Sequence, residues 1–246
     1  ESILLVNKKT VTLFVVALNE IDGLKAIMPR IDKNWVDQIL IVDGDSRDGT
    51  VEYAKENGYE IVVQKRKGIR CAYNEAFPHV RGDYVITFSP DGNCPPEFIP
   101  DLIKKITGEN WDMVVASRHM PPAKSADDTI ITAFGNKMFS NLCSILHGHN
   151  YHDCLGMFRI YKTKFFYDLG LDKDEAYWME KYCFTIMGIE PLLSTRAAKM
   201  KLRIAEIPCD EPKRIYGDPK RQNFRWGLAY LAQMILEAFT NEYRAT

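Results

Sequence analysis

The chain has 246 residues, of which 46% are hydrophobic, so it can form one large or two small folded domains and is not disordered. Its 32 basic and 33 acidic residues give a net charge of −1, which argues against a nucleic-acid partner. Six scattered cysteines exclude a zinc knuckle or a redox CxxC pair and predict reduced thiols in a cytoplasmic protein. No secretory signal is expected, and no apolar run approaches the ~20 residues needed to cross a bilayer.

Strand and helix patterns alternate regularly through the first half. Runs rich in β-branched residues predict strands at 10–18, 38–43, 59–64, 83–88 and 111–117. Helix patterns fall between them, at 19–31, 50–58, 68–80 and 95–106. This alternation predicts an α/β fold with a mostly parallel, Rossmann-like sheet flanked by helices.

The second half is less regular. An amphipathic helix is expected over 127–146, further helix over 190–200, and strands at 156–161 and 202–208. The stretch 224–239 predicts a helix that is apolar almost all round. We therefore expect one domain over 1–222 and a C-terminal helical extension over 223–246. Packing of this helix on its own core or in a homodimer is preferred, and contact with the inner face of the membrane is the alternative.

Polar side chains follow several predicted strands. They include Asn19, Asp43, Asp45, Asp91 and Arg118. Because ligands of open α/β sheets bind beyond the carboxyl ends of the strands, these side chains should converge on one edge. Carboxylates suit the donors of a base and ribose, a lone Asp after a strand suits Mg²⁺ or Mn²⁺, and arginines suit phosphates. The pattern favours a nucleoside diphosphate as ligand.

Six motifs then occur in a fixed order. They read VALNE, ILIVDGDSRDGT, RKG, RGDYVITFSPDGNCPPE, VVASR and DCLGMFRIY. In this order they resemble the family-2 glycosyltransferases with the GT-A fold, and most of all the dolichyl-phosphate mannose synthase branch. The resemblance runs from about residue 10 to about residue 222.

The resemblance implies a nucleoside-diphosphate sugar as the donor. Asp43 would hold the base and ribose, and a basic loop over 214–220 would close over the diphosphate. The expected donor-binding residues are Ala17, Asn19, Glu20, Asp43, Asp45, Gly68, Arg70, Ser89, Pro90, Asp91, Arg118, Arg214 and Lys220.

The resemblance also implies a divalent metal ion, Mg²⁺ or Mn²⁺. Asp91 would be the second Asp of the family's DxD motif, and Ser89 stands where the first Asp is usual. Asn93 is a further candidate ligand. Since a hydroxyl is a weaker ligand than a carboxylate, the ion is expected to depend more on the donor's phosphates.

The acceptor decides which catalytic group is needed. A polyprenyl phosphate is already anionic near neutral pH, whereas a hydroxyl of a glycan or small molecule needs a general base. The base candidates are Asp153 and Glu180, and Arg159 is expected to face the active site. The transfer is expected to invert the anomeric centre. A sugar-phosphate nucleotidyltransferase and a non-catalytic nucleotide-sugar-binding protein are the alternatives.

Overall fold

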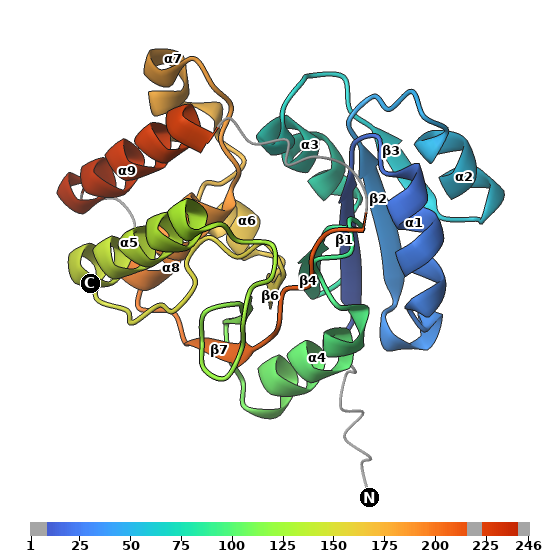
Figure 1. Cartoon of the computed structure of the whole chain (residues 1–246), viewed down its shortest axis with the longest axis horizontal. Helices are drawn as coiled ribbons and strands as arrows, with labels where there is room; N and C mark the ends of the chain where they lie inside the picture. The colour runs from blue at the N-terminus through green and yellow to red at the C-terminus, as the bar shows by residue number, and fades with distance from the viewer. Residues whose placement is uncertain (1–8, 216–222, 241–246) are drawn as a thin grey trace, which may run out of the picture.

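The computed structural model describes residues 9–215 and 223–240. The strands of these residues form one sheet in the order β3-β2-β1-β4-β6-β5-β7 (Figure 1). All neighbouring strands run parallel except β6, which is antiparallel to β4 and β5. The strands are β1 (Val11–Ala17), β2 (Gln38–Asp43), β3 (Glu60–Val63), β4 (Tyr84–Phe88), β5 (Met113–Ser117), β6 (Arg159–Lys162) and β7 (Ile204–Pro208). The predicted α/β class with a mostly parallel sheet is confirmed.

Helices cover both faces of the sheet. The α-helices are α1 (Ile21–Ile27), α2 (Thr50–Glu56), α3 (Ile69–Ala76), α4 (Ile99–Gly108), α5 (Ile130–His147), α6 (Phe165–Asp168), α7 (Met179–Cys183), α8 (Glu190–Lys199) and α9 (Asn223–Phe239). Short 3-10 helices are η1 (Met28–Arg30), η2 (Lys33–Trp35), η3 (Phe77–His79), η4 (Pro96–Phe98) and η5 (Asp174–Tyr177).

Two apolar cores lie on opposite faces of the sheet. Successive strand residues point to opposite faces, so Leu13 joins the core under α1, α2 and α4, while Phe14 joins the core under α3, α5 and α8. Every residue of α8 is buried. Burial on both sides explains why the strands read as continuous apolar runs rather than as alternating ones.

The C-terminal helix α9 packs against α5, α7 and α8 of its own chain (Figure 1). Ala229, Gln233, Met234 and Glu237 form its buried face. This agrees with the preferred expectation of core packing. Among the described residues, no helix is both long and apolar enough to cross a membrane. All six cysteines are buried free thiols, as predicted.

Candidate active site

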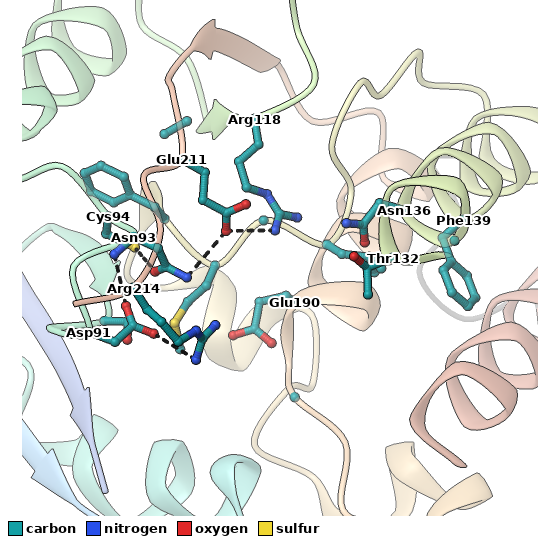
Figure 2. Close-up of a pocket in the computed structure, with 18 of the residues that line it drawn as sticks. Asp91, Asn93, Cys94, Arg118, Thr132, Asn136, Phe139, Glu190, Glu211 and Arg214 are labelled. Atoms are coloured by element: carbon teal, nitrogen blue, oxygen red, sulfur yellow. Dashed lines mark hydrogen bonds and ion pairs between the residues drawn. The ribbon is translucent and has the colours of Figure 1, made fainter. Parts of the chain in front are cut away.

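A cavity of about 430 Å³ opens beyond the carboxyl ends of β4, β5 and β7. This is the edge at which α/β sheets place their ligands. In Figure 2, the carboxylates of Asp91, Glu190 and Glu211 and the guanidinium of Arg214 face a common space, with Asn136 of α5 across it. The walls come from the loop after β4, the segment before β6, the first turns of α5 and α8, the segment after β7, and α9.

The loop after β4 places Asp91 at the cavity. Gly92 has a left-handed φ of +95°, and a Cβ there would clash with Ile215. The Ile215 amide donates to the Asp91 carbonyl at 2.8 Å, so the segment after β7 is fastened over this loop. The Pro-Asp-Gly sequence therefore forms a turn that holds Asp91, only 8% exposed, against the cavity.

Arg214 brings a permanent positive charge to the same loop. Its Nη2 lies 2.7 Å from Asp127 Oδ2, and its Nη1 lies 3.8 Å from Asp91 Oδ2. The hydrogen bonds to Asp127 raise the pKa of Arg214 above its ordinary value. The structure thus brings Arg214 and Asp91 together, as the sequence predicted. Lys220, the other basic residue of that prediction, lies outside the described residues.

A second buried ion pair lies beside it. Arg118 donates to Asp153 through Nε at 2.6 Å and through Nη2 at 2.9 Å, and its Nη1 lies 3.3 Å from Glu211. Burial alone would raise the pKa of Asp153, but the charge and hydrogen bonds of Arg118 outweigh it and lower this pKa to about 2. Asp153 is 0% exposed and does not line the cavity. In this structure Asp153 is a buried counter-ion for Arg118, and its assignment as a general base stays a prediction that the cavity lining does not support.

Glu190 is a cavity residue that sequence reasoning missed. It begins α8, is 7% exposed, and accepts a hydrogen bond from the Tyr73 hydroxyl at 3.0 Å. Burial raises the pKa of Glu190 above the ordinary 4.5, although the charge of Arg159 and the Tyr73 hydrogen bond oppose this. Gly188 keeps room for it, because a Cβ there would clash with the Glu190 carboxylate. A carboxyl group with a raised pKa in a cavity is a candidate acid or base.

The other predicted catalytic residues lie elsewhere. Arg159 is fully buried and donates to the Gly156 carbonyl at 2.7 Å and to Ser194 Oγ at 2.9 Å, so it braces the segment before β6 and does not face the cavity. Glu180 belongs to a separate surface pocket near α7. There it pairs with Arg70, with 2.7 Å between Oε2 and Nη2.

Two predicted donor-binding residues also have structural roles. Besides Glu180, Arg70 contacts Asp174 and lies over the Tyr177 ring at 4.6 Å, so its guanidinium ties α3 to the η5–α7 segment. Gly68 precedes α3 with φ of +109°, and a Cβ there would clash with Ile186. Neither residue lines the cavity.

The acidic residue that ends β2 lies beside the end of β1. Ala17 and Asp43 are register partners across the two strands. Asp43 is fully buried, and its Oδ2 accepts from the Ser46 amide at 2.8 Å. Its Oδ1 is buried with no hydrogen-bond partner in the part of the chain that the structure describes. An orphaned buried acceptor of this kind is costly unless a ligand donates to it.

Neighbouring loop residues frame this position. The Asn19 amide donates to Ser46 Oγ at 2.7 Å, and Asn19 Oδ1 accepts from the Arg47 amide at 2.9 Å. The Glu20 amide donates to Thr50 Oγ1 at 3.1 Å. The exposed Asp45 adopts a left-handed φ of 68° in the turn between them. Pro90 is buried, and its carbonyl closely approaches Gly23 of α1.

The oxygen atoms near Asp91 fit a divalent ion in part. Asp91 supplies a carboxylate, and the Ser89 hydroxyl belongs to the same cavity wall. Asn93 lines the cavity, but its Nδ2 donates to Glu211 at 3.4 Å and its Oδ1 accepts from Cys94 at 3.7 Å. No cluster of three or more His, Cys, Asp or Glu suited to a metal ion occurs among residues 9–215 and 223–240. Segment 89–93 therefore offers one carboxylate, that of Asp91, and a bound diphosphate would have to complete the ligand set.

Comparisons with curated proteins give several transferases, some of which are named for a polyprenyl phosphate. Glycosyltransferase AglJ of Haloferax volcanii is 25% identical over 77% of this chain and 59% of its own length. The undecaprenyl-phosphate 4-deoxy-4-formamido-L-arabinose transferase of Klebsiella pneumoniae is 28% identical over 86% and 62%. The dolichyl-phosphate hexose transferase of H. volcanii is 26% identical over 86% of both chains. The chain thus spans about three fifths of the first two relatives.

Solved structures agree on the fold. Glucosyl-3-phosphoglycerate synthase from Mycobacterium tuberculosis, in complex with Mn²⁺, UDP and glucosyl-3-phosphoglycerate, superposes with a TM-score of 0.63 over 94% of this chain and 80% of the other, at 18% identity. A mycobacterial protein superposes with a TM-score of 0.68 over 94% and 75%. At this identity the likeness establishes the GT-A fold and nothing further.

The family model "Glycosyl transferase family 2" matches residues 12–170, which run from the second residue of β1 through β6 and include Asp43, Asp91 and Arg118. Together with the GT-A fold and the cavity at the carboxyl edge of its sheet, this match identifies the chain as a member of glycosyl transferase family 2.

Proposed function

We propose that this chain transfers a sugar from a nucleoside-diphosphate sugar to an acceptor in the cavity, with inversion of the anomeric centre and with the help of Mg²⁺ or Mn²⁺. The observation that carries the proposal is the pair Asp43 and Asp91. Asp43, at the end of β2, has a buried Oδ1 with no hydrogen-bond partner among the described residues. Asp91, in the loop after β4, faces the cavity. Only β1 separates these strands, so their ends lie roughly 10 Å apart, a span that a nucleoside diphosphate can bridge.

Each end of the donor has a separate partner in this proposal. Asp43 accepts from the base or ribose, with Ala17, Asn19 and Glu20 around it. Asp91, with Ser89 and the donor's phosphates, holds the divalent ion. When bound, the ion stabilises the negative charge that develops on the leaving diphosphate. Arg214 adds a fixed positive charge beside Asp91.

The relatives support a nucleotide-sugar donor and a polyprenyl-phosphate acceptor, and a hydroxyl acceptor is the second class that the sequence left open. Structures of the mycobacterial synthase contain UDP-glucose and Mn²⁺, and curated relatives are named as transferases to undecaprenyl or dolichyl phosphate. We therefore propose a polyprenyl phosphate or a hydroxyl acceptor such as a glycan. Contact with a membrane surface or with a second copy stays a prediction, motivated by exposed apolar side chains on α5 and α9 such as Ile131, Phe134 and Phe239.

Calorimetric titration of UDP, GDP and CDP, with and without Mn²⁺, tests the donor site. One nucleotide should bind, and Mn²⁺ should strengthen its binding. Asp43→Asn should weaken it about 10-fold or more, because a hydrogen bond to a charged acceptor contributes about 1.5–3 kcal/mol. Asp91→Asn should abolish the gain from Mn²⁺. Asp101→Asn removes an exposed carboxylate of α4 and serves as the matched control. Unchanged affinities in both site variants would refute the proposed site.

A further inference from the structure

On the basis of the proposed function, we infer that the acceptor is a neutral hydroxyl compound and that Glu190 is the base that takes its proton. This chooses one of the two acceptor classes above. It also moves the base to a residue that neither the sequence motifs nor the relatives indicated. The charges of the cavity, the position of Glu190 and the groups around it carry the inference.

Among the described residues, the cavity lining offers little available positive charge. Its described lining holds four carboxylates, on Asp91, Glu190, Asp210 and Glu211, against two guanidinium groups. Both of these cations already have acidic partners: Arg118 pairs with Asp153 and Glu211, and Arg214 pairs with Asp127. An acceptor phosphate would bring further negative charge to a wall that is already acidic, and like charges brought together cost several kcal/mol.

Glu190 differs from the other buried carboxylates of the cavity wall. Asp91 and Glu211 each have an arginine within 4.0 Å. Glu190 has no basic side chain at that distance in the described part of the chain, and its side chain accepts a hydrogen bond from the Tyr73 hydroxyl. Its carboxylate faces the open space of the cavity (Figure 2). It is therefore placed to accept a proton from a molecule bound there.

The environment of Glu190 tunes it for that role. The titratable and charged groups that act on it are Tyr73 of α3, Tyr161 and Arg159 of β6, and Tyr177 of η5. The tyrosines are neutral, since burial raises the pKa of each above its ordinary value of 10. Burial correspondingly raises the pKa of Glu190, and a base whose pKa approaches the working pH is the most efficient.

The rest of the wall suits a neutral acceptor. Thr132 and Asn136 of α5 offer hydroxyl and amide groups, and Phe139, Trp226 and Tyr230 add aromatic surface. A mostly apolar wall with a few hydrogen-bonding groups is typical of sites for uncharged small molecules.

The step balances without any further reactant. The acceptor O–H gives its proton to the Glu190 carboxylate while its oxygen forms a bond to the anomeric carbon. The bond from that carbon to the diphosphate oxygen breaks, and its electron pair leaves with the nucleoside diphosphate. Glu190 then releases the proton to solvent. Water can replace the acceptor hydroxyl, which gives slow hydrolysis of the donor by the same route.

The test measures release of nucleoside diphosphate from UDP-glucose or GDP-mannose, chosen by the titration above, with Mn²⁺. The added acceptors are none (water), methyl and octyl glucosides, and undecaprenyl phosphate. The variants are Glu190→Gln, Glu190→Asp and the exposed control Glu52→Gln of α2. Nucleotide affinity is measured for each variant in parallel, because it reports on the donor site and on folding.

We expect hydroxyl acceptors or water to support release, and Glu190→Gln to slow it about 100-fold or more with unchanged nucleotide affinity. Glu190→Asp should retain an intermediate rate, and Glu52→Gln the full rate. The rate of nucleoside-diphosphate release by the wild type should rise with pH through a pKa above the ordinary carboxyl range. This rise should be absent in Glu190→Gln. Tyr73→Phe removes a hydrogen bond that lowers the pKa of Glu190, so in this variant the rise in rate should occur at higher pH.

Two results would overturn the inference and leave the proposed function standing. One is release that undecaprenyl phosphate accelerates equally in wild type and Glu190→Gln. The other is normal nucleotide binding without release to any hydroxyl acceptor, water included. Absence of nucleotide binding would instead refute the proposed function.

Discussion

Two buried carboxylates, Asp153 and Glu190, show how environment assigns roles that residue type leaves open. Arg118 lowers the pKa of Asp153 to about 2, whereas burial without a paired cation raises the pKa of Glu190. The partners lie far away in sequence: Arg118 is 35 residues from Asp153, and Tyr73 is 117 residues from Glu190. Sequence motifs do not reveal contacts between residues this far apart. For this reason the motifs indicated Asp153 as a base candidate and did not indicate Glu190.

Glu190 should reduce stability at neutral pH. Its pKa is raised in the folded state, so the folded protein favours the protonated form of Glu190. The stability that this protonated form contributes is lost as the pH rises from the ordinary carboxyl pKa of 4.5 through the raised pKa. Glu190→Gln keeps an acceptor for Tyr73 and removes the charge. Its melting temperature should match that of wild type at low pH and exceed it at pH 7 to 8. Thermal unfolding of both proteins across this range measures the difference, and parallel curves would show that Glu190 is not destabilised when charged.

At the scale of elements, α9 is fixed to α8 by buried charge. Glu237 lies between Arg196 and Lys199, at 2.9 Å from Nη2 of the first and 3.0 Å from Nζ of the second. Removing one member leaves the others buried without a counter-charge, so Glu237→Ala should lower the free energy of unfolding by about 3–5 kcal/mol.

The matched control is Leu228→Ala, because Leu228 is an exposed residue of the same helix. It should change stability by no more than about 0.5 kcal/mol. Chemical denaturation measures both variants. A loss of less than about 1 kcal/mol in Glu237→Ala would mean that apolar packing, not this ion-pair cluster, holds α9 in place.

Long elements were predictable from sequence and short ones were not. The five strands of the first half, the strand at β7 and the helices α5 and α9 all lie where their apolar patterns indicated, within a few residues. The short elements α6, η5 and α7 span too few residues to show a period, and they form through contacts such as that of Arg70 with Glu180. The antiparallel direction of β6 also cannot be predicted from its local sequence, because it depends on the path that the chain takes through α5.

The site was predictable to the extent that strand ends determine it. Asp43 ends β2, Arg118 directly follows β5 and Asp91 comes three residues after β4, so the sheet itself brings them to its carboxyl edge. Ion pairs and backbone acceptors, which no local pattern reveals, occupy the side chains of Arg159, Glu180 and Arg70, so their roles at the site stay predictions.

At the scale of the whole molecule, the two halves of the sheet carry different parts of the candidate site. The half with β3, β2 and β1 carries Asp43, and the half with β6, β5 and β7 surrounds the cavity together with α5, α8 and α9 (Figure 1). Asp91 follows β4, at the junction between the halves. Under the proposed function, donor and acceptor would approach from different sides and meet at Asp91, as a transfer reaction requires.

The central claim is that the chain splits a nucleoside-diphosphate sugar at this junction. Release of nucleoside diphosphate from UDP- and GDP-sugars, followed over time with Mn²⁺, tests it most directly. We predict turnover in the wild-type protein that chelation of the metal abolishes and that Asp91→Asn lowers about 100-fold or more, while its melting temperature stays close to that of wild type. Equal turnover in wild type and Asp91→Asn, or none with any nucleotide sugar, would contradict the account.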